Sequence, residues 1–113
     1  MGKFEITKRK DGEFQFNLKA GNGEIILSSE GYSTKINCTK GIESVRKNSM
    51  VATRFEQKYS TNNKYYFNLK ASNGQIIGTS QMYKSSASCM NGIESVKKNA
   101  PSAEITDLTV LEL

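Results

Sequence analysis

One segment of this chain is written twice. FNLKAGNGEII, which begins at Phe16, recurs as FNLKASNGQII at Phe67, and GIESVRKN, which begins at Gly41, recurs as GIESVKKN at Gly92. Both matches have the same offset, 67 − 16 = 51 and 92 − 41 = 51, with no gap between them. A repeat of this length is typical of one supersecondary unit used twice, in which each copy buries its apolar face against the other. The repeats run from about 4 to 49 and from about 55 to 100.

Each repeat begins with three predicted strands. Apolar residues alternate with polar ones from Phe14 to Ala20 and from Tyr65 to Ala71, and a period of two is typical of a half-buried strand. Asn-Gly pairs at 22–23 and 73–74 suit tight hairpin turns in which both central residues have positive φ. Asp11-Gly12 and Asn62-Asn63 suit the same kind of turn one strand earlier. We expect strands at about 3–9, 13–20, 24–28, 52–59, 64–71 and 75–79.

A helix is predicted after the third strand of each repeat. Cys38, Ile42 and Val45 are spaced i, i+4 and i+7, which places them on one helix face, and Cys89, Ile93 and Val96 repeat the pattern. Gly41 and Gly92 lie inside these helices at a cost of about 1 kcal/mol each against Ala, which indicates close packing. The predicted boundary residues are Ser33 and Ser85 as N-caps, Asn48 and Asn99 in left-handed C-cap positions, and Pro101 as the stop of the second helix.

These elements predict an α+β fold. A three-stranded sheet with one helix, about 50 residues long, would be marginally stable alone. We therefore expect a single domain over residues 1–113, in which two tandem β-β-β-α repeats form one antiparallel sheet with both helices packed on one face. Residues 102–113 lie outside the repeats, and their apolar side chains suit docking as an extended C-terminal tail. These side chains are Ile105, Leu108, Val110 and Leu111.

The doubled sequence also resembles a known family. FNLKASNGQIIGTSQMYKS followed by CMNGIESVKKNA, with the same pattern earlier in the chain, is similar to the YegP-like family of small uncharacterised bacterial proteins. The resemblance covers nearly the whole chain. It implies two β(3)-α motifs that form a single sheet with their helices exchanged between halves, and it brings no catalytic residues. The first repeat departs mildly at 36–40, INCTK where the second has ASCMN, which affects packing only.

Composition narrows the classes of function. Lys and Arg number 16 against 11 Asp and Glu, so the net charge is +5, and the chain contains no histidine, the commonest general base and metal ligand. Neither a Gly-rich phosphate loop nor a nucleophile elbow is present. We expect a non-enzymatic protein without a catalytic residue, cofactor or metal ion. Since no apolar run is long enough to cross a bilayer and the N-terminus lacks a secretion signal, we also expect a cytoplasmic location without a membrane partner.

The repeated cysteines, Cys38 and Cys89, have two interpretations. They could form a redox pair if the twofold arrangement brought them together. Alternatively, they are small apolar residues on the buried face of each helix, which we favour because free cysteine is among the most buried residue types.

Repeated carboxylates also have two interpretations. Glu5 with Glu56, or Glu43 with Glu94, could act as a general acid and base. The local interpretation is simpler, because Glu43 to Lys47 and Glu94 to Lys98 are favourable i,i+4 pairs. Glu5 and Glu56 fall on the polar side of the first strand of each repeat.

The polar face of the predicted sheet is the first candidate binding surface. If Phe16 and Phe67 point toward the helices, their neighbours form a basic face with one aromatic residue. Sheet faces of this kind bind single-stranded nucleic acid by stacking bases and contacting phosphates. We expect weak binding of nucleic acid or another polyanion there, although a solvated sheet face is polar for solubility alone. The candidate residues are Lys19, Lys70, Arg54, Lys58, Tyr66, Asn17 and Asn68.

The alternative is a protein-interaction module. An edge strand offers unpaired backbone groups that a protein partner or a second copy of this chain could complete, giving a complex or a homodimer. Tyr32 and Tyr83, at the junction between the third strand and the helix, could anchor such a partner. We favour a structural role for both tyrosines, packed over the start of the helix.

Overall fold

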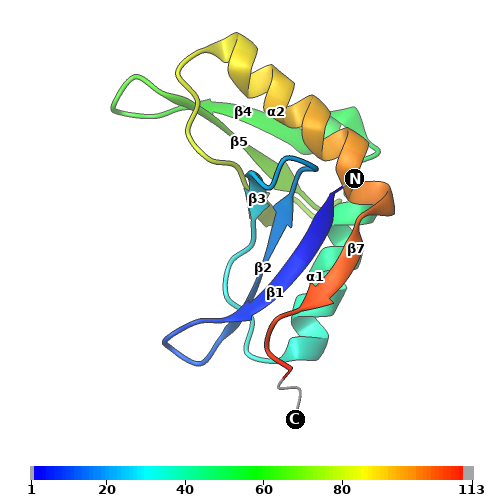
Figure 1. Cartoon of the computed structure of the whole chain (residues 1–113). Helices are drawn as coiled ribbons and strands as arrows, with labels where there is room; N and C mark the ends of the chain where they lie inside the picture. Colours follow the sequence, from blue (N-terminus) through cyan, green and yellow to red (C-terminus); the bar gives the residue numbers. More distant parts are fainter. Residues whose placement is uncertain (1, 111–113) are drawn as a thin grey trace.

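The computed structural model describes residues 2–110 (Figure 1). The first repeat comprises β1 (Lys3–Lys8), β2 (Phe14–Lys19), β3 (Ile25–Ser28) and α1 (Lys35–Asn48). The second comprises β4 (Phe55–Tyr59), β5 (Tyr65–Lys70), β6 (Ile76–Thr79) and α2 (Ser86–Asn99). Short 3-10 helices, η1 (Ala52–Arg54) and η2 (Ala100–Ser102), follow α1 and α2, and β7 (Glu104–Asp107) comes last. Within this described part, the helices are too short and too polar to cross a membrane.

All the strands belong to one sheet, in the order β4-β5-β6-β3-β2-β1-β7. The two repeats join at the centre, where Ser28 of β3 pairs with Thr79 of β6. Each half is antiparallel, but β7 pairs with β1 in parallel, so the sheet is mixed where a wholly antiparallel one was predicted. The parallel direction arises because α2 ends beside Gly2, at the start of β1, and the chain enters the sheet at the same end as β1.

The C-terminal tail docks mainly through its backbone. Its residues Glu104–Asp107 pair with Lys3–Ile6, which fits the predicted extended tail. The side chains of Ile105, Leu108 and Val110 all remain more than a third exposed, whereas Ala103 is buried. Leu111, the fourth residue expected to dock, lies outside the described residues.

Both helices pack on one face of the sheet and tie the two repeats together. The resemblance implied exchanged helices; in the structure α1 packs on β2 of its own repeat and on β5 and β6 of the other, and α2 packs on β5 and on β3. A single core results, and Figure 1 shows the β1–β2 hairpin extending from it toward the lower left and the β4–β5 hairpin toward the upper left. Its largest fully buried side chains include Phe4, Phe16, Phe67, Leu18, Leu27, Ile42 and Leu69.

The seam between the repeats is packed asymmetrically. Leu27 and Gly78 are equivalent by the offset of 51, yet one is a large residue and the other has no side chain. Leu27 is fully buried, and a Cβ atom placed on Gly78 would lie only 2.6 Å from its Cγ. The space near the pseudo-twofold axis thus holds one leucine, and the glycine opposite makes room for it.

Two predicted strand and turn details were wrong. Residues 52–54 form η1 rather than the start of a strand, because the chain must turn from the end of α1 back into the sheet; the Arg54 N–H donates to Val51 O over 3.0 Å. The Asn-Gly turns have positive φ only at glycine, +86° at both Gly23 and Gly74. Each is a type I turn followed by a left-handed glycine, in which the asparagine Oδ1 accepts the backbone N–H two residues later. Asn63, with φ of 64°, does adopt the left-handed conformation, as expected for the residue equivalent to Gly12 in the first repeat.

Equivalent residues of the two repeats form the ends of α1 and α2, and some of them differ from the predicted caps. Ser85 caps α2, but Thr34, not Ser33, caps α1: its Oγ1 accepts the Asn37 N–H over 3.1 Å. Thr34 is the residue 51 positions before Ser85. Asn48 and Asn99 are not left-handed; each is the last residue of its helix and donates its side-chain amide to the serine carbonyl four residues earlier. At the end of α1 the terminal carbonyls are met by the residues that follow the helix: the Ser49 hydroxyl donates to Arg46 O over 3.0 Å, and the Val51 N–H donates to Asn48 O over 3.0 Å.

The helix glycines make room for the junction tyrosines. Tyr32 stacks on Phe16 with ring centroids 6.2 Å apart, and a Cβ on Gly41 would lie 2.8 Å from the Tyr32 Cζ. Tyr83 stacks in the same way on Phe67, beneath Gly92. The favoured structural position of both tyrosines is what the structure shows, although they lie under the helix rather than over its start.

Candidate functional site

The sheet face opposite the helices carries a polar row that crosses all seven strands. Residues directly opposite one another on paired strands lie on the same face, so the register of the strands defines the row. We call this set the outer row: Glu56, Asn68, Thr79, Ser28, Asn17, Glu5 and Thr106. The predicted site residues Asn17 and Asn68 belong to it, while Ser28 and Thr79, at the seam, were missed. Ser28 and Thr79 line a depression of about 620 Å³.

Two glutamates of the outer row hold four lysines. The Glu5 carboxylate forms ion pairs with two lysines, with the Lys19 Nζ at 2.9 Å and the Lys3 Nζ at 3.4 Å. The hydrogen bond from Lys19 lowers the pKa of the Glu5 carboxyl. The Glu56 carboxylate pairs in the same way with the Lys70 Nζ at 3.0 Å and the Lys58 Nζ at 3.4 Å. The hydrogen bond from Lys70 lowers the pKa of the Glu56 carboxyl. The structure therefore brings Lys19, Lys70 and Lys58 to the expected face, but each lies beside a carboxylate. Four lysines and two glutamates leave a net charge of 4 − 2 = +2 there.

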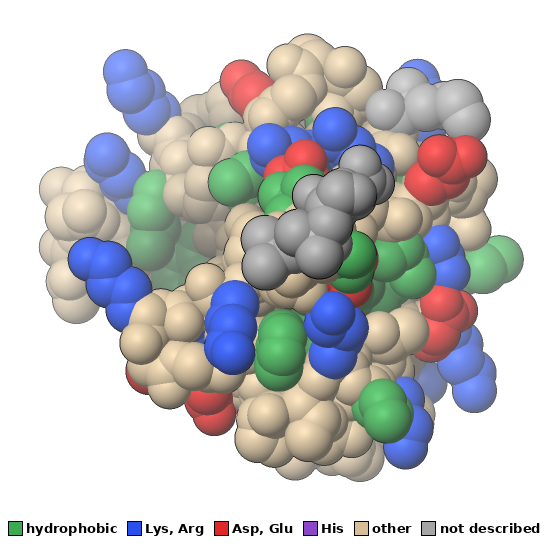
Figure 2. All heavy atoms as spheres, turned by 60° about the horizontal axis from the view of Figure 1, so that its bottom comes forward, with side chains coloured by type: hydrophobic (Ala, Val, Ile, Leu, Met, Phe, Trp, Pro, Cys, Tyr) green, Lys and Arg blue, Asp and Glu red, His purple; other side chains and the backbone are tan. Residues whose placement is uncertain are grey.

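The remaining residues of the predicted basic face are less available than their types suggest. Tyr66 is half-buried, and Asn68 is only 5% exposed because its Oδ1 accepts the Thr79 hydroxyl at 2.9 Å. Figure 2, which views the molecule from the lower end of Figure 1, shows Lys and Arg side chains spread among polar and acidic ones on that side rather than gathered in one patch.

Arg54 does not lie on the basic face. It belongs to η1, not to the predicted strand, and lines a cavity of about 550 Å³ together with Lys40 and Lys47 of α1. Its Nε is buried without a hydrogen-bond partner. Residues 49–51 separate η1 from α1, and Arg54 lines the same cavity as these helix residues rather than belonging to the outer row.

The repeated cysteines and helix glutamates have structural positions. Cys38 and Cys89 are both fully buried and free, and burial raises the pKa of the Cys38 thiol to about 11, as expected for small core residues. The helix ion pairs exist with different partners: Glu43 pairs with Arg46 and Glu94 with Lys97, both at i,i+3 rather than the predicted i,i+4. Residues 2–110 contain no group of three His, Cys, Asp or Glu side chains arranged to hold a metal ion.

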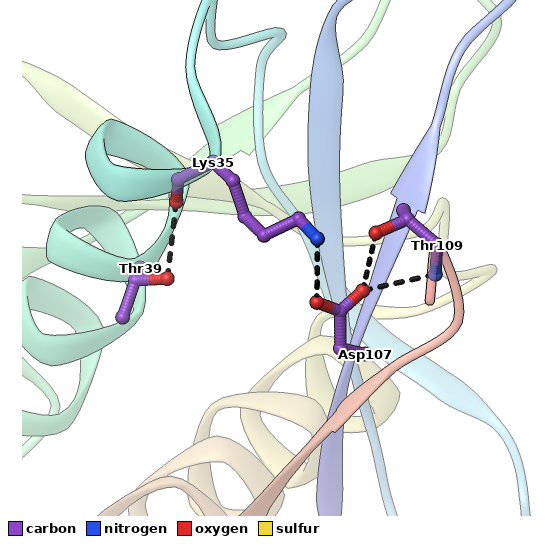
Figure 3. Close-up of polar contacts among 4 residues, drawn as sticks. All are labelled: Lys35, Thr39, Asp107 and Thr109. Atoms are coloured by element: carbon purple, nitrogen blue, oxygen red, sulfur yellow. Dashed lines mark hydrogen bonds and ion pairs between the residues drawn. The ribbon is translucent and has the colours of Figure 1, made fainter. Parts of the chain in front are cut away.

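The edge of the sheet at β1 is covered by β7. The Leu108 N–H donates to Ile6 O over 3.0 Å, and Arg46 of α1 donates to the carbonyl of Ala103. Figure 3 shows Lys35 reaching from the start of α1 to Asp107, with its Nζ 2.8 Å from Oδ2, while Thr109 closes on the other carboxylate oxygen. Lys35 and Thr109 hold the pKa of Asp107 at about 2. The tail is thus fixed by contacts to both β1 and α1.

The opposite edge, at β4, has no such cover. β4 is the last strand of the sheet order among residues 2–110. A groove of about 230 Å³ runs between β4 and α2, and we call it the β4–α2 groove. Its lining residues are Ala52, Phe55, Gln57, Met90, Ile93, Glu94 and Lys97.

Sequence reasoning named a sheet edge as a candidate but did not identify which one. A signal was present in the sequence: two equivalent repeats have two equivalent edges, and residues 102–113 supply a segment that lies outside the repeats. In the structure this segment covers the edge at β1 and not the edge at β4.

Comparisons with known proteins agree with this fold. A family model described as a domain of unknown function, DUF1508, matches twice, at residues 10–56 and 60–107. The UPF0339 protein YegP of Escherichia coli K12 is 54% identical over 108 residues, which cover 96% of this chain and 98% of that one. The UPF0339 protein of Acinetobacter baylyi is 55% identical over 108 residues, 96% and 97% of the two chains.

Two solution NMR structures are similar over nearly the whole chain. That of a UPF0339 protein from Shewanella oneidensis has a TM-score of 0.90 at 51% identity and covers 95% of this chain and 91% of its own. That of yegP from E. coli, titled a protein of unknown function, has a TM-score of 0.90 at 53% identity, with 95% and 92% covered. None of these names denotes an enzyme. The chain therefore belongs to the UPF0339, or YegP-like, family of uncharacterised bacterial proteins, built from a tandem pair of DUF1508 domains.

Proposed function

We propose that this protein is a non-enzymatic interaction module that binds an extended segment of a protein partner along β4. The single observation that carries the proposal is the open edge of β4 beside the β4–α2 groove. An edge strand with unpaired backbone groups binds another strand through main-chain hydrogen bonds, while neighbouring pockets select side chains.

The direction of the backbone groups follows from the hydrogen bonds on the other side of the sheet. Phe67 O accepts the Ser80 N–H, so the backbone groups of Phe67 face β6. Because these groups alternate along a strand, those of Tyr66 and Asn68 face β4, and they pair with Lys58 and Glu56. The backbone groups of the residues between, at positions 55, 57 and 59, therefore point to the open edge.

The side chains along this edge leave apolar surface exposed. Phe4 in β1 is fully buried, whereas its equivalent Phe55 is only partly buried. Met90 of α2 is 48% exposed at the other wall of the groove, and Tyr59 is 60% exposed at the end of β4. A strand added here would bury apolar area, which contributes about 25 cal/mol per Å².

Site-specific photo-crosslinking tests this function. A photoreactive phenylalanine analogue at Tyr59, in the full chain in bacterial cells, is expected to form adducts, and a matched probe at Ile36, which is 70% exposed on α1, is not. Gln57→Pro removes the N–H that points to the open edge, and proline is tolerated at edge strands. Adducts that survive Gln57→Pro, or that form equally from both positions, would show that β4 is not the binding surface.

Sedimentation distinguishes a partner from a second copy. A protein that stays monomeric at all concentrations lacks the homodimer form of the interaction.

Polyanion binding by the outer face is a second candidate, and the net charge of +2 around the outer row favours it. Fluorescence anisotropy with labelled single-stranded RNA or DNA would then show weak binding at low salt, reduced further by Lys19→Glu with Lys70→Glu. Flat anisotropy at high protein concentration would exclude it.

A further inference from the structure

We infer that the β4–α2 groove accepts a strand parallel to β4, with the chemistry of this chain's own β7 but with a neutral polar residue in place of Asp107. The inference rests on the proposed function and adds the direction and the side chains of the partner segment.

The groove is the second copy of a site that is filled in the first repeat. At the offset of 51, its residues Phe55, Gln57, Met90, Ile93, Glu94 and Lys97 are equivalent to Phe4, Ile6, Thr39, Ile42, Glu43 and Arg46. In the first repeat, Phe4 pairs with Ile105, Ile6 pairs with Asp107, and Arg46 holds the Ala103 carbonyl. In the second repeat the corresponding position beside Phe55 and Gln57 holds no strand, since β4 begins at Phe55 after η1 and is an outermost strand of the described sheet.

The equivalent contacts define two side chains of the partner. A small residue fits the Ala103 position, and its carbonyl can accept from Lys97, whose Nζ lies 3.1 Å from Glu94 and has further protons to donate. Two residues later, opposite Phe55, an apolar residue corresponds to Ile105 opposite Phe4.

The next partner side chain on the same face of the strand, two residues after the apolar one, has different surroundings in the two sites. In the first repeat it is Asp107, opposite Ile6 and paired with Lys35. In the second repeat Gln57 replaces Ile6 and Ser86 replaces Lys35, and the Gln57 amide donates to the Ser86 hydroxyl over 2.9 Å. No cation replaces Lys35, so a carboxylate would lose its counter-charge, whereas an amide or hydroxyl can join the Gln57–Ser86 pair.

The β7 of a second copy is a poor occupant. To reach the groove it would have to leave its own site, with the Lys35–Asp107 ion pair, the Arg46 hydrogen bond and the Leu108 hydrogen bond. Binding to another molecule would replace these contacts with similar ones. It would also lose the high effective concentration that β7 has for its own site within one chain. A segment from another protein has no such cost.

A peptide titration tests the inference on the full chain. The probe is the blocked peptide SAEITDLTV, the sequence of residues 102–110, together with its Asp107→Asn version. NMR spectra of the labelled protein should shift at residues 55–59 and 90–97, with the Asn version binding more tightly than the Asp version. A spin label at the peptide N-terminus should broaden signals near Phe55 more than those near Tyr59, because the strands are parallel.

Matched variants define the result. Met90→Glu places a charge in the groove at an exposed position that need not affect folding, and should weaken the peptide by about tenfold or more, as should Ile105→Asp in the peptide. The control, Ile36→Glu on the exposed part of α1, should leave binding unchanged. Antiparallel broadening, or equal binding of the reversed sequence, would overturn this inference while leaving β4 as a binding edge. An absence of shifts at millimolar peptide would also overturn it, and the crosslinking experiment then decides the proposed function separately.

Discussion

Exchanging Leu27 and Gly78 should show that the two repeats share one core. Leu27 is fully buried, so Leu27→Ala alone removes a well-packed side chain at the seam and should lower the free energy of unfolding by about 3 kcal/mol. Gly78→Leu alone forces a second side chain against one only 2.6 Å from its Cβ, which should cost about 2 kcal/mol or more. Separate effects of these sizes would add to about 5 kcal/mol.

The double variant Leu27→Ala with Gly78→Leu should lose less than about 2 kcal/mol, because the new leucine enters the space that the old one left. Urea unfolding followed by circular dichroism measures the three variants, with Gly78→Ala as a control for replacing glycine in a strand. If the double variant loses the sum of the single effects, the two positions do not share one space, and the packing of the seam described above is wrong.

Two further predictions concern buried and paired groups. Asp107 has a pKa of about 2 in the folded chain, below its ordinary value of 3.8, so its ion pair stabilises above about pH 4 and this contribution disappears as the pH falls through 2. Since Lys35 is 40% exposed, Asp107→Asn should cost only about 1 kcal/mol at pH 7, measured by urea unfolding, and the difference should shrink toward pH 2 and vanish below it; a difference that keeps its pH 7 size below pH 2 would contradict the ion pair. Cys38 and Cys89 should react with a thiol reagent in native buffer only as the chain opens, and modification at the rate of free cysteine would contradict their burial.

Much of the fold could be predicted from the sequence because the repeat constrains it twice. Period-two alternation around Phe16 and Phe67 identified the middle strands, and the spacing of Cys38, Ile42 and Val45 identified the buried face of the helix. The errors fell where the backbone has several local solutions. Ser33 and Thr34 are both suitable N-caps by type, and only the offset of 51 distinguishes them.

The candidate site was harder to predict because it depends on pairing between distant segments. Lys19, Lys58 and Lys70 were placed on the correct face, but the sharing of Glu5 and Glu56 between strands follows from the register, which the alternation alone does not fix. The parallel addition of β7 depends on where α2 ends in space. The edge at β4 is open because β7 pairs with β1 instead, and no single residue in the sequence indicates this.

Amide hydrogen exchange of the full chain tests the open edge most directly. Ile6 and Gln57 are equivalent in the repeat, and the backbone of each points away from its own hairpin, toward β7 for Ile6 and toward the outer edge for Gln57. We expect the Ile6 amide to be protected by a factor of about a thousand or more and the Gln57 amide to exchange within about tenfold of the rate of an unprotected amide. Equal protection at both positions would contradict an open edge at β4.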